Sequence, residues 1–208
     1  MIIIKGIGWI KQQEYGCAIK KIRRNYDNMR ALYSQLNEEK IFSYPIKSFG
    51  KSDAVSKNTC CTTALALHDA SISYAEDRKQ DMGILGTNTA GCVQSNADYF
   101  KDYVESGRTL ARGNLFVYTL PSTPLADAAI HFKCQGPVLY MAFKGEQIPS
   151  LLRHAEKMIL RDEAPAMLAV RSDEKEGVCF VLAREEVLTE NVMKPEDVIA
   201  GAECGNFI

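Results

Sequence analysis

Five short apolar runs, separated by segments long enough to form helices, constrain the fold of this chain most. The runs lie at residues 1–10, 82–86, 138–143, 166–170 and 178–183, and each has the length and composition of a buried strand. The segments between them carry helical patterns and turn residues. Strands that alternate with helices in this way predict an α/β fold in which helices cover a sheet.

The intervening segments predict five helices. One is expected near residues 27–36, and a second from a Ser56 cap to about residue 75. The apolar positions of this second helix predict a single buried face with polar positions opposite, formed by Cys60, Ala64, Leu67 and Ile72. The other three helices are expected at residues 96–104, 121–134 and 149–160.

Composition favours one globular domain. Of the 208 residues, 46% are hydrophobic and 25% are charged, and the net charge is −1. No linker or low-complexity segment divides residues 1–208, so a single domain is expected, and the near-neutral charge argues against nucleic-acid binding. Lys5 interrupts the opening apolar run and no apolar stretch could span a bilayer, so we expect no signal peptide, no membrane contact and a cytoplasmic location.

The cysteines and histidines do not suggest a metal or cofactor. The seven cysteines include no CxxC pair, so free thiols in a reducing compartment are expected, with no metal and no cofactor. The Gly-rich residues 83–91 lack the Lys-Ser/Thr pair of a P-loop and predict a turn after a strand. Cys92 follows this turn and is a candidate reactive thiol.

Four segments carry motifs in a recognisable order. Residues 2–10 are similar to an opening strand in which Lys5 replaces a Thr, and residues 83–91 resemble V-G-x-x-x-G-T-G-x-G. Residues 120–137 resemble L-P-N-x-x-A-x-x-x-A-x-x-x-G-x-x-G-P with Ser122 in place of the Asn. Residues 177–205 resemble a strand, its connection and a following strand.

Together these segments resemble the N-terminal half of a β-ketoacyl synthase, a condensing enzyme of the thiolase superfamily. The resemblance implies half of a thiolase-type fold, with a layered mixed sheet of about five strands and helices on both faces. It does not extend to residues 11–57, for which no match is found.

The resemblance also implies where a nucleophile would lie. In the family, the strand after the Gly-Pro pair leads to a Cys at a helix N-terminus, where the dipole lowers the thiol pKa and main-chain N–H groups form an oxyanion hole. The matching positions here are Gly145, Glu146 and Gln147, none of which can accept an acyl group. No segment resembles the C-terminal half with its two histidines, so we expect no catalytic residues.

Loss of this Cys, often to Gln, is typical of chain-length factors, which are ketosynthase-like subunits that pair with an active ketosynthase. The resemblance therefore implies a non-catalytic partner of a full-length β-ketoacyl synthase in fatty acid, polyketide or aryl-polyene biosynthesis. An acyl carrier protein is a further expected partner. The acyl-tunnel candidates are Phe116, Tyr118, Tyr140 and Met141.

In the thiolase fold, the strand before the nucleophile pairs with its counterpart in a second subunit. We therefore expect residues 138–143 to form a sheet edge at which Val138, Leu139 and Phe143 contribute to a dimer. Strand periodicity places Leu139, Met141 and Phe143 on one face and the intervening residues on the other.

Two other functions remain open. The chain could be a homodimeric module that binds an acyl chain or an acyl carrier protein, without a ketosynthase partner. It could instead be an enzyme that uses Cys92 as a relocated thiol.

Overall fold

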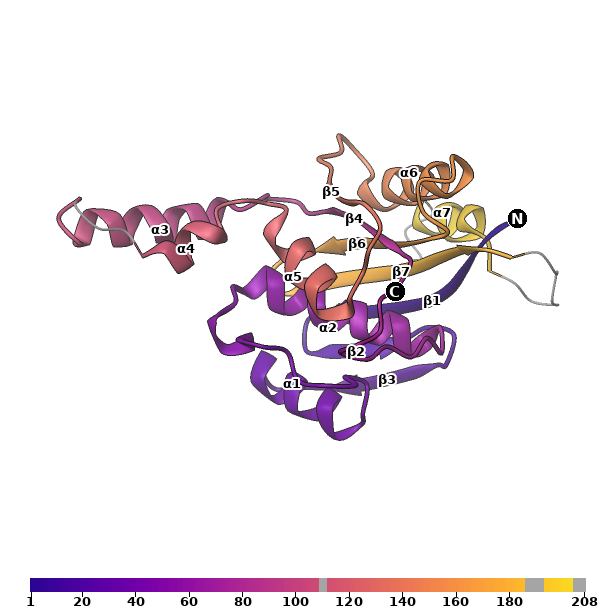
Figure 1. Cartoon of the computed structure of the whole chain (residues 1–208), viewed down its shortest axis with the longest axis horizontal. Helices are drawn as coiled ribbons and strands as arrows, with labels where there is room; N and C mark the ends of the chain where they lie inside the picture. The colour runs from indigo at the N-terminus through magenta and orange to yellow at the C-terminus, as the bar shows by residue number, and fades with distance from the viewer. Residues whose placement is uncertain (109–111, 186–192, 204–208) are drawn as a thin grey trace.

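Residues 1–108, 112–185 and 193–203 are described by the computed structural model, and they form one seven-stranded mixed sheet (Figure 1). The strand order is β3-β2-β1-β7-β6-β4-β5. Strand β4 pairs in parallel with β5 and β6, whereas β7 pairs antiparallel with β6 and β1. The strands are β1 (Ile2–Lys11), β2 (Glu14–Cys17), β3 (Ile22–Asn25), β4 (Gly83–Thr87), β5 (Val138–Tyr140), β6 (Ala166–Ser172) and β7 (Glu176–Arg184).

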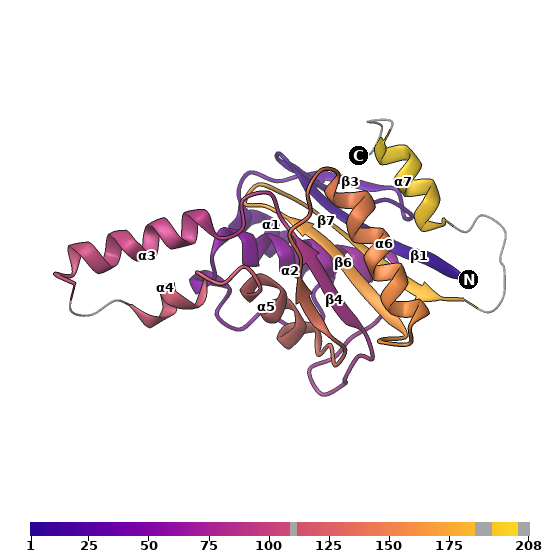
Figure 2. The same ribbon diagram turned by 90° about the horizontal axis from the view of Figure 1, so that it is seen from above.

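Helices cover both faces of the sheet, as Figures 1 and 2 show. Helices α1, α2 and α5 lie on one face and α6 and α7 on the other, while α3 and α4 project together from one end of the molecule. This arrangement confirms the expected layered α/β fold. The helices are α1 (Met29–Glu38), α2 (Ala54–Asp69), α3 (Val93–Glu105), α4 (Gly113–Val117), α5 (Thr123–Phe132), α6 (Gln147–Leu160) and α7 (Pro195–Glu203), with a short 3₁₀ helix at Phe49–Lys51.

The sheet is wider than the expected five strands, because β2 and β3 extend it beyond β1 within the region that had no match. Each of these strands has only four residues, and β3 is exposed along most of its length. A short polar strand lacks the apolar run by which strands are recognised in a sequence. Strand β2 pairs with β1 because the turn between them reverses the chain and places Glu14 beside Lys11.

Helix α2 differs from its expected boundaries and from its expected single buried face. It begins at Ala54, because the Asp53 side chain accepts a hydrogen bond from the Ser56 main-chain nitrogen at 2.8 Å, and it ends at Asp69. Asp53, rather than Ser56, is therefore the cap. Polar and apolar side chains of α2 are buried alike, since the helix lies between the sheet, α1 and α5. A helix buried on all sides has no amphipathic pattern.

Glycines in β1 allow α2 to approach the sheet closely. A Cβ atom added to Gly8 would lie 2.3 Å from the main-chain nitrogen of Ala66, and one added to Gly6 would lie 2.4 Å from the Ala66 oxygen. Both distances are too short for a side chain of any kind. The two glycines therefore set the separation between the central helix and its sheet.

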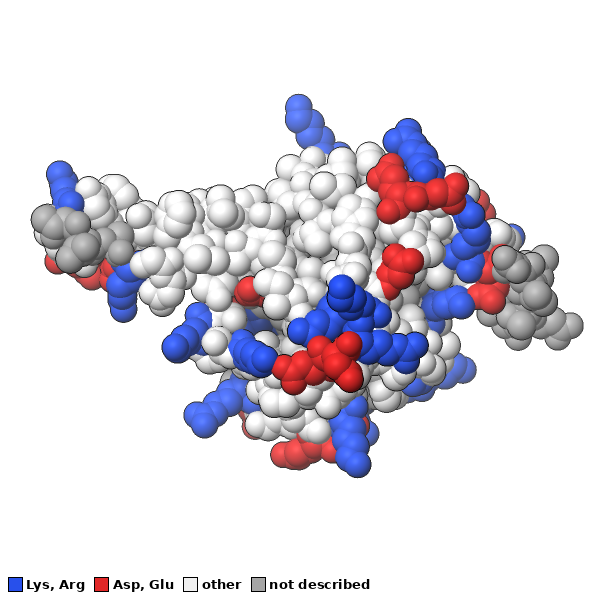
Figure 3. Space-filling view, in the orientation of Figure 1, with Lys and Arg blue, Asp and Glu red and all other residues white. Residues whose placement is uncertain are grey.

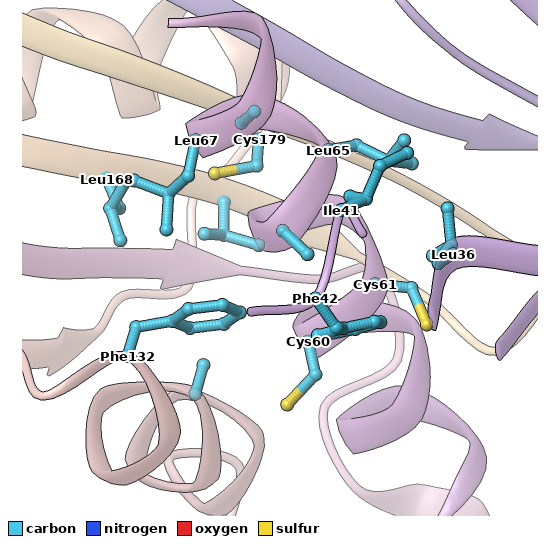
Figure 4. Packing of buried hydrophobic residues seen from close by; sticks show 14 of the residues in the cluster. Leu36, Ile41, Phe42, Cys60, Cys61, Leu65, Leu67, Phe132, Leu168 and Cys179 are labelled. Atoms are coloured by element: carbon cyan, nitrogen blue, oxygen red, sulfur yellow. The ribbon is translucent and has the colours of Figure 1, made fainter. Parts of the chain in front are cut away.

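Two apolar cores lie on opposite faces of the sheet. Figure 4 shows part of the core beneath α2, in which Cys60, Cys61 and Phe132 pack with leucines of α2 and the sheet. Burial raises the pKa of the Cys60 and Cys61 thiols well above the ordinary value. All six described cysteines are free, and these two act as small apolar side chains.

The C-terminal segment is helical, which corrects the strand implied for it by the resemblance. Helix α7 begins at Pro195 and has Glu196 and Asp197 in its first turn, a combination that favours a helix N-terminus. The Asp197 side chain also accepts a hydrogen bond from the Lys194 main-chain nitrogen at 3.0 Å. The last part of the expected strand, residues 204–208, lies outside the described residues.

Candidate functional site at the N-terminus of helix α6

The three positions implied for the nucleophile lie in the connection from β5 to α6. Gly145 has a φ of +82° and turns the chain, Glu146 is the N-cap residue, and Gln147 is the first residue of α6. A positive φ of this size favours glycine. The turn places the Gln147 side chain at the positive end of a 14-residue helix.

Both ends of the Gln147 carboxamide are hydrogen-bonded to other segments. Its Nε2 donates to the main-chain oxygen of Asn88 at 2.9 Å, and its Oε1 accepts from Nε of Arg171 at 3.2 Å. Asn88 follows β4 and Arg171 lies near the end of β6. The Gln147 side chain therefore joins α6 to the carboxyl ends of two parallel strands.

Asn88 organises the turn after β4 and connects it to β5. Its Oδ1 accepts hydrogen bonds from the Gly91 main-chain nitrogen at 2.7 Å and from the Tyr140 hydroxyl at 2.9 Å. Its Nδ2 donates to the Gly91 oxygen at 2.9 Å. Burial raises the pKa of Tyr140, so its hydroxyl remains a hydrogen-bond donor at neutral pH.

Arg171 is the positive centre of the network. It forms ion pairs with Asp173 at 2.7 Å and with Glu176 at 2.8 Å. Asp173 also accepts hydrogen bonds from the nitrogen and the hydroxyl of Thr89, at 2.9 and 3.0 Å. Two carboxylates outweigh one guanidinium, so these side chains leave no excess of positive charge with which to attract an anion.

An open hollow of about 390 Å³ lies over this network and is lined by Thr89, Arg171 and the residues from Gly145 to Pro149. A carboxamide cannot form an acyl intermediate, because its nitrogen lone pair is delocalised into the carbonyl group. Gln147 therefore cannot carry out acyl transfer, although the hollow has room for a group at the helix N-terminus.

Sequence reasoning found Gln147 but missed Asn88, Thr89, Arg171 and Asp173. Asn88 and Thr89 follow β4, Arg171 lies near the end of β6 and Asp173 follows it, and the carboxyl ends of these two strands meet at one edge of the sheet. Ligand sites of α/β proteins lie at this edge. Polar residues at and just after the ends of the parallel strands were the signal that could have identified them.

The structure does not bring the four acyl-tunnel candidates together. Phe116 lies on α4, 53% exposed, with its ring 5.6 Å from that of Tyr99. Tyr118 lines hollows of about 570 and 190 Å³, neither of which includes the other three candidates. Tyr140 packs on the α2 side of the sheet and Met141 on the α6 side.

The expected dimer edge lies at the end of the sheet. Strand β5 pairs with β4 on one side and, among the described residues, with no strand on the other. It is shorter than expected and ends at Tyr140. Val138 packs on the α2 side and Phe143 on the α6 side, while Leu139 is 43% exposed.

Cys92 is the N-cap residue of α3, outside the Gln147 network. Its Sγ lies 2.7 Å from the Thr119 main-chain oxygen, to which it donates, and accepts a hydrogen bond from Asn96 Nδ2 at 3.2 Å. The thiol is half-buried and lines the hollow of about 570 Å³.

In the described part of the chain, no cluster of histidine, cysteine or acidic side chains could hold a metal ion. Likewise, no described helix has the length and apolar character needed to cross a bilayer.

The strand order, the buried central helix and the helix N-terminus after β5 define the thiolase-type ketosynthase fold. Comparison with solved structures confirms this class. The ishigamide ketosynthase/chain length factor matches with a TM-score of 0.60 and 12% identity, over 90% of this chain and 63% of that one. A β-ketoacyl synthase from Burkholderia phymatum STM815 matches with a TM-score of 0.56 and 14% identity, over 89% and 59%.

A third similar structure is AntDE:AntF, a type II polyketide synthase acyl-carrier protein in complex with its ketosynthase, with a TM-score of 0.61 and 12% identity over 89% and 63% of the two chains. The present chain thus spans less than two thirds of the length of these similar structures. No family model matches the chain, and no curated protein matches it.

Proposed function

We propose that this protein is a non-catalytic, chain-length-factor-like subunit that pairs with an active β-ketoacyl synthase. The observation that carries the proposal is Gln147, which occupies the helix N-terminus after β5 and is held there by hydrogen bonds to Asn88 and Arg171. The ketosynthase fold is retained around a position that cannot accept an acyl group. Such a subunit supplies a contact surface and part of the wall of the acyl tunnel, and the active ketosynthase supplies the catalytic residues.

The free edge of β5 supports pairing with a second subunit. An edge strand presents unpaired main-chain N–H and C=O groups, which favour antiparallel pairing with another edge. Leu139 is the exposed apolar side chain of this short strand, with 43% of its surface accessible. We place the subunit interface along β5, so that Leu139 is buried when the partner binds.

The projecting arm formed by α3 and α4 supplies a second apolar surface. On the face seen in Figure 3, this arm shows few charged side chains between its tip and the body of the molecule. Its exposed apolar residues are Val93, Phe100, Val104, Phe116 and Val117. An exposed patch of this kind is typical of an interaction site. The arm is therefore the second place where a partner subunit would make contact.

The remaining parts of the proposal concern the setting in which this subunit works. We place it in the cytoplasm, in fatty acid, polyketide or aryl-polyene biosynthesis, where acyl chains are carried on an acyl carrier protein. The retained ketosynthase fold supports this class of pathway. The four acyl-tunnel candidates do not form a tunnel within this chain. In the proposal they contribute to the wall of an acyl tunnel that the partner subunit completes.

A tagged pull-down from the native cell, with mass spectrometry of the co-purifying proteins, tests the proposed partner. We expect a full-length ketosynthase in stoichiometric amount. Leu139→Lys should release it by placing a charge in the interface, whereas Leu160→Lys, at an exposed leucine at the far end of α6, should retain it. Absence of any ketosynthase would overturn the proposal.

The same edge supports a second function, a homodimeric module that binds an acyl chain or an acyl carrier protein. An antiparallel edge strand can pair with its own copy about a two-fold axis. Recovery of only this chain in the pull-down, as a dimer that Leu139→Lys dissociates, would favour that function.

A further inference from the structure

A hollow of about 570 Å³ lies where the projecting arm meets the body of the molecule. Its lining comes from the first half of α3, from α4, from the N-terminus of α2 and from the turn between β6 and β7. It shares Asn88, Asp173 and Glu176 with the network around Gln147, and its other lining residues lie outside that network. Sites for small molecules have volumes of about 300–1,000 Å³, so the hollow is large enough to hold one.

Apolar side chains form much of this lining. Val55 comes from α2, Val93 from the start of α3, Leu115 from α4, and Tyr118 from the residue that ends α4. Val93 is 67% exposed, and the other three are partly buried. Their remaining apolar surface contacts water, so an apolar group that covers it would bind favourably.

The charged side chains of the lining are mostly acidic. The hollow has five carboxylates and two ammonium groups, namely those of Asp53, Asp98, Asp173, Glu174 and Glu176 and those of Lys51 and Lys175. Arg171 does not line the hollow but pairs with Asp173 and Glu176, so carboxylates outnumber cations five to three even when it is counted. An excess of negative charge around a hollow raises the local concentration of cations.

Three of the five carboxylates, those of Asp53, Asp98 and Glu174, form no ion pair within the described part of the chain. Asp53 accepts a hydrogen bond from the Ser95 hydroxyl at 2.9 Å, and this contact holds α3 against the N-terminus of α2. Asp98 lies three residues after Ser95, a spacing that places both on one face of α3. Asp53 and Asp98 therefore lie on the same side of the hollow, and the exposed Glu174 lines it from the turn after β6.

We propose that this hollow binds a small organic cation with an apolar body, such as an aromatic amine. Its ammonium group donates charge-assisted hydrogen bonds to the carboxylates, and its apolar body covers Val93, Leu115 and Tyr118. A small inorganic cation would leave the apolar lining in water, and a neutral apolar molecule would leave the carboxylates without a cation. The proposal is independent of the ketosynthase partner, because every residue of the lining belongs to this chain.

Isothermal titration with tryptamine tests the site, because this probe joins an indole ring to a primary ammonium group. We expect saturable 1:1 binding that weakens as the salt concentration rises. Tryptophol has a hydroxyl group in place of the ammonium, and ethylamine has the ammonium without the ring. Each should bind at least tenfold more weakly than tryptamine, because each supplies only one half of the contacts.

Variants connect the binding to the named residues. Asp98→Asn and Glu174→Gln each remove one carboxylate and should weaken tryptamine binding severalfold, while the weaker binding of tryptophol stays unchanged. Val93→Ser should weaken the binding of both molecules, because it removes apolar surface. Glu163→Gln, at an exposed glutamate outside the hollow, is the matched control and should alter neither affinity.

Circular dichroism and thermal melting check that each variant is folded. Any of three results would overturn the proposal: no saturable binding of tryptamine, equal affinities for tryptamine and tryptophol, or tryptamine binding that neither Asp98→Asn nor Glu174→Gln weakens.

Discussion

Gln147 donates a hydrogen bond to the main-chain oxygen of Asn88 across 2.9 Å, and this contact joins the N-terminus of α6 to the turn after β4. Arg171 donates to the other end of the same carboxamide at 3.2 Å. The side chain therefore acts as a structural bridge between α6 and two strands. Its replacement should affect stability rather than turnover.

Gln147→Ala removes both hydrogen bonds and should lower the free energy of unfolding by about 1–3 kcal/mol, since each half-buried bond contributes about 0.5–1.5 kcal/mol. Urea denaturation followed by circular dichroism measures the change. Gln135→Ala removes an exposed glutamine side chain and serves as the control, with an expected change within about 0.5 kcal/mol. Equal effects of the two substitutions would show that the bridge contributes nothing.

Gln147→Cys places a thiol at the N-terminus of α6, where the helix dipole favours the thiolate. In a Cys92→Ser background, iodoacetamide should label this thiol at pH 7 faster than one introduced by Ser150→Cys in the next turn. Mass spectrometry of the modified peptide gives both rates. The variant should still not condense acyl and malonyl thioesters by itself, and equal labelling rates would argue that the helix N-terminus is not activating.

Gly8→Ala should destabilise the protein by on the order of 3 kcal/mol, because the new methyl group would overlap main-chain atoms of α2. Thermal and urea unfolding measure the loss. Gly50→Ala is the control, since a Cβ at Gly50 meets no atom within 4 Å and its φ is not positive. A Gly8→Ala variant as stable as the wild type would contradict the close approach of α2 to β1.

Stability should fall between about pH 6.5 and pH 4 because of His131. Burial and the nearby Lys133 lower the pKa of this histidine to about 4 from an ordinary value of 6.5, while Glu76 partly offsets them. In this interval the unfolded chain takes up a proton that the folded chain does not, so unfolding becomes more favourable as the pH decreases. The loss amounts to about 2–3 kcal/mol, at 1.36 kcal/mol per pKa unit.

The contribution of His131 is isolated by comparing the wild type with His131→Gln. The free energy of unfolding of the wild type should decrease more steeply with falling pH over this interval. Above about pH 7 the two pH profiles should have the same slope. Parallel pH profiles for the two proteins would show that His131 is not buried in its neutral form.

Strands with continuous apolar runs could be predicted from the sequence because burial on both faces leaves an unmistakable pattern. Strands β4, β6 and β7 are of this kind. The β2–β3 hairpin was missed since its side chains are largely polar and its pairing depends on β1. The prediction of a single buried face for α2 was wrong. Asn58, Thr59 and Thr63 are polar and yet fully buried, so their pattern indicated a solvent-exposed face.

The candidate site was predictable only in part. Gly145, Glu146 and Gln147 could be located because the resemblance allows a count along the chain from Gly136 and Pro137. The polar residues at the ends of β4 and β6 were a signal for Asn88 and Arg171, but their hydrogen bonds to Gln147 could not be predicted, since these arise from the parallel alignment of the two strands. Contacts between residues distant in the chain have no signature in a single sequence.

The product profile of the partner ketosynthase, measured with and without this chain, tests the central claim most directly. The ketosynthase that co-purifies with the protein would be supplied with acyl and malonyl thioesters on an acyl carrier protein, and the products would be separated by mass spectrometry. We predict no condensation by this chain alone, and a changed product length or yield when it joins the ketosynthase. Condensation by this chain alone, or an identical profile in its presence and absence, would contradict the account.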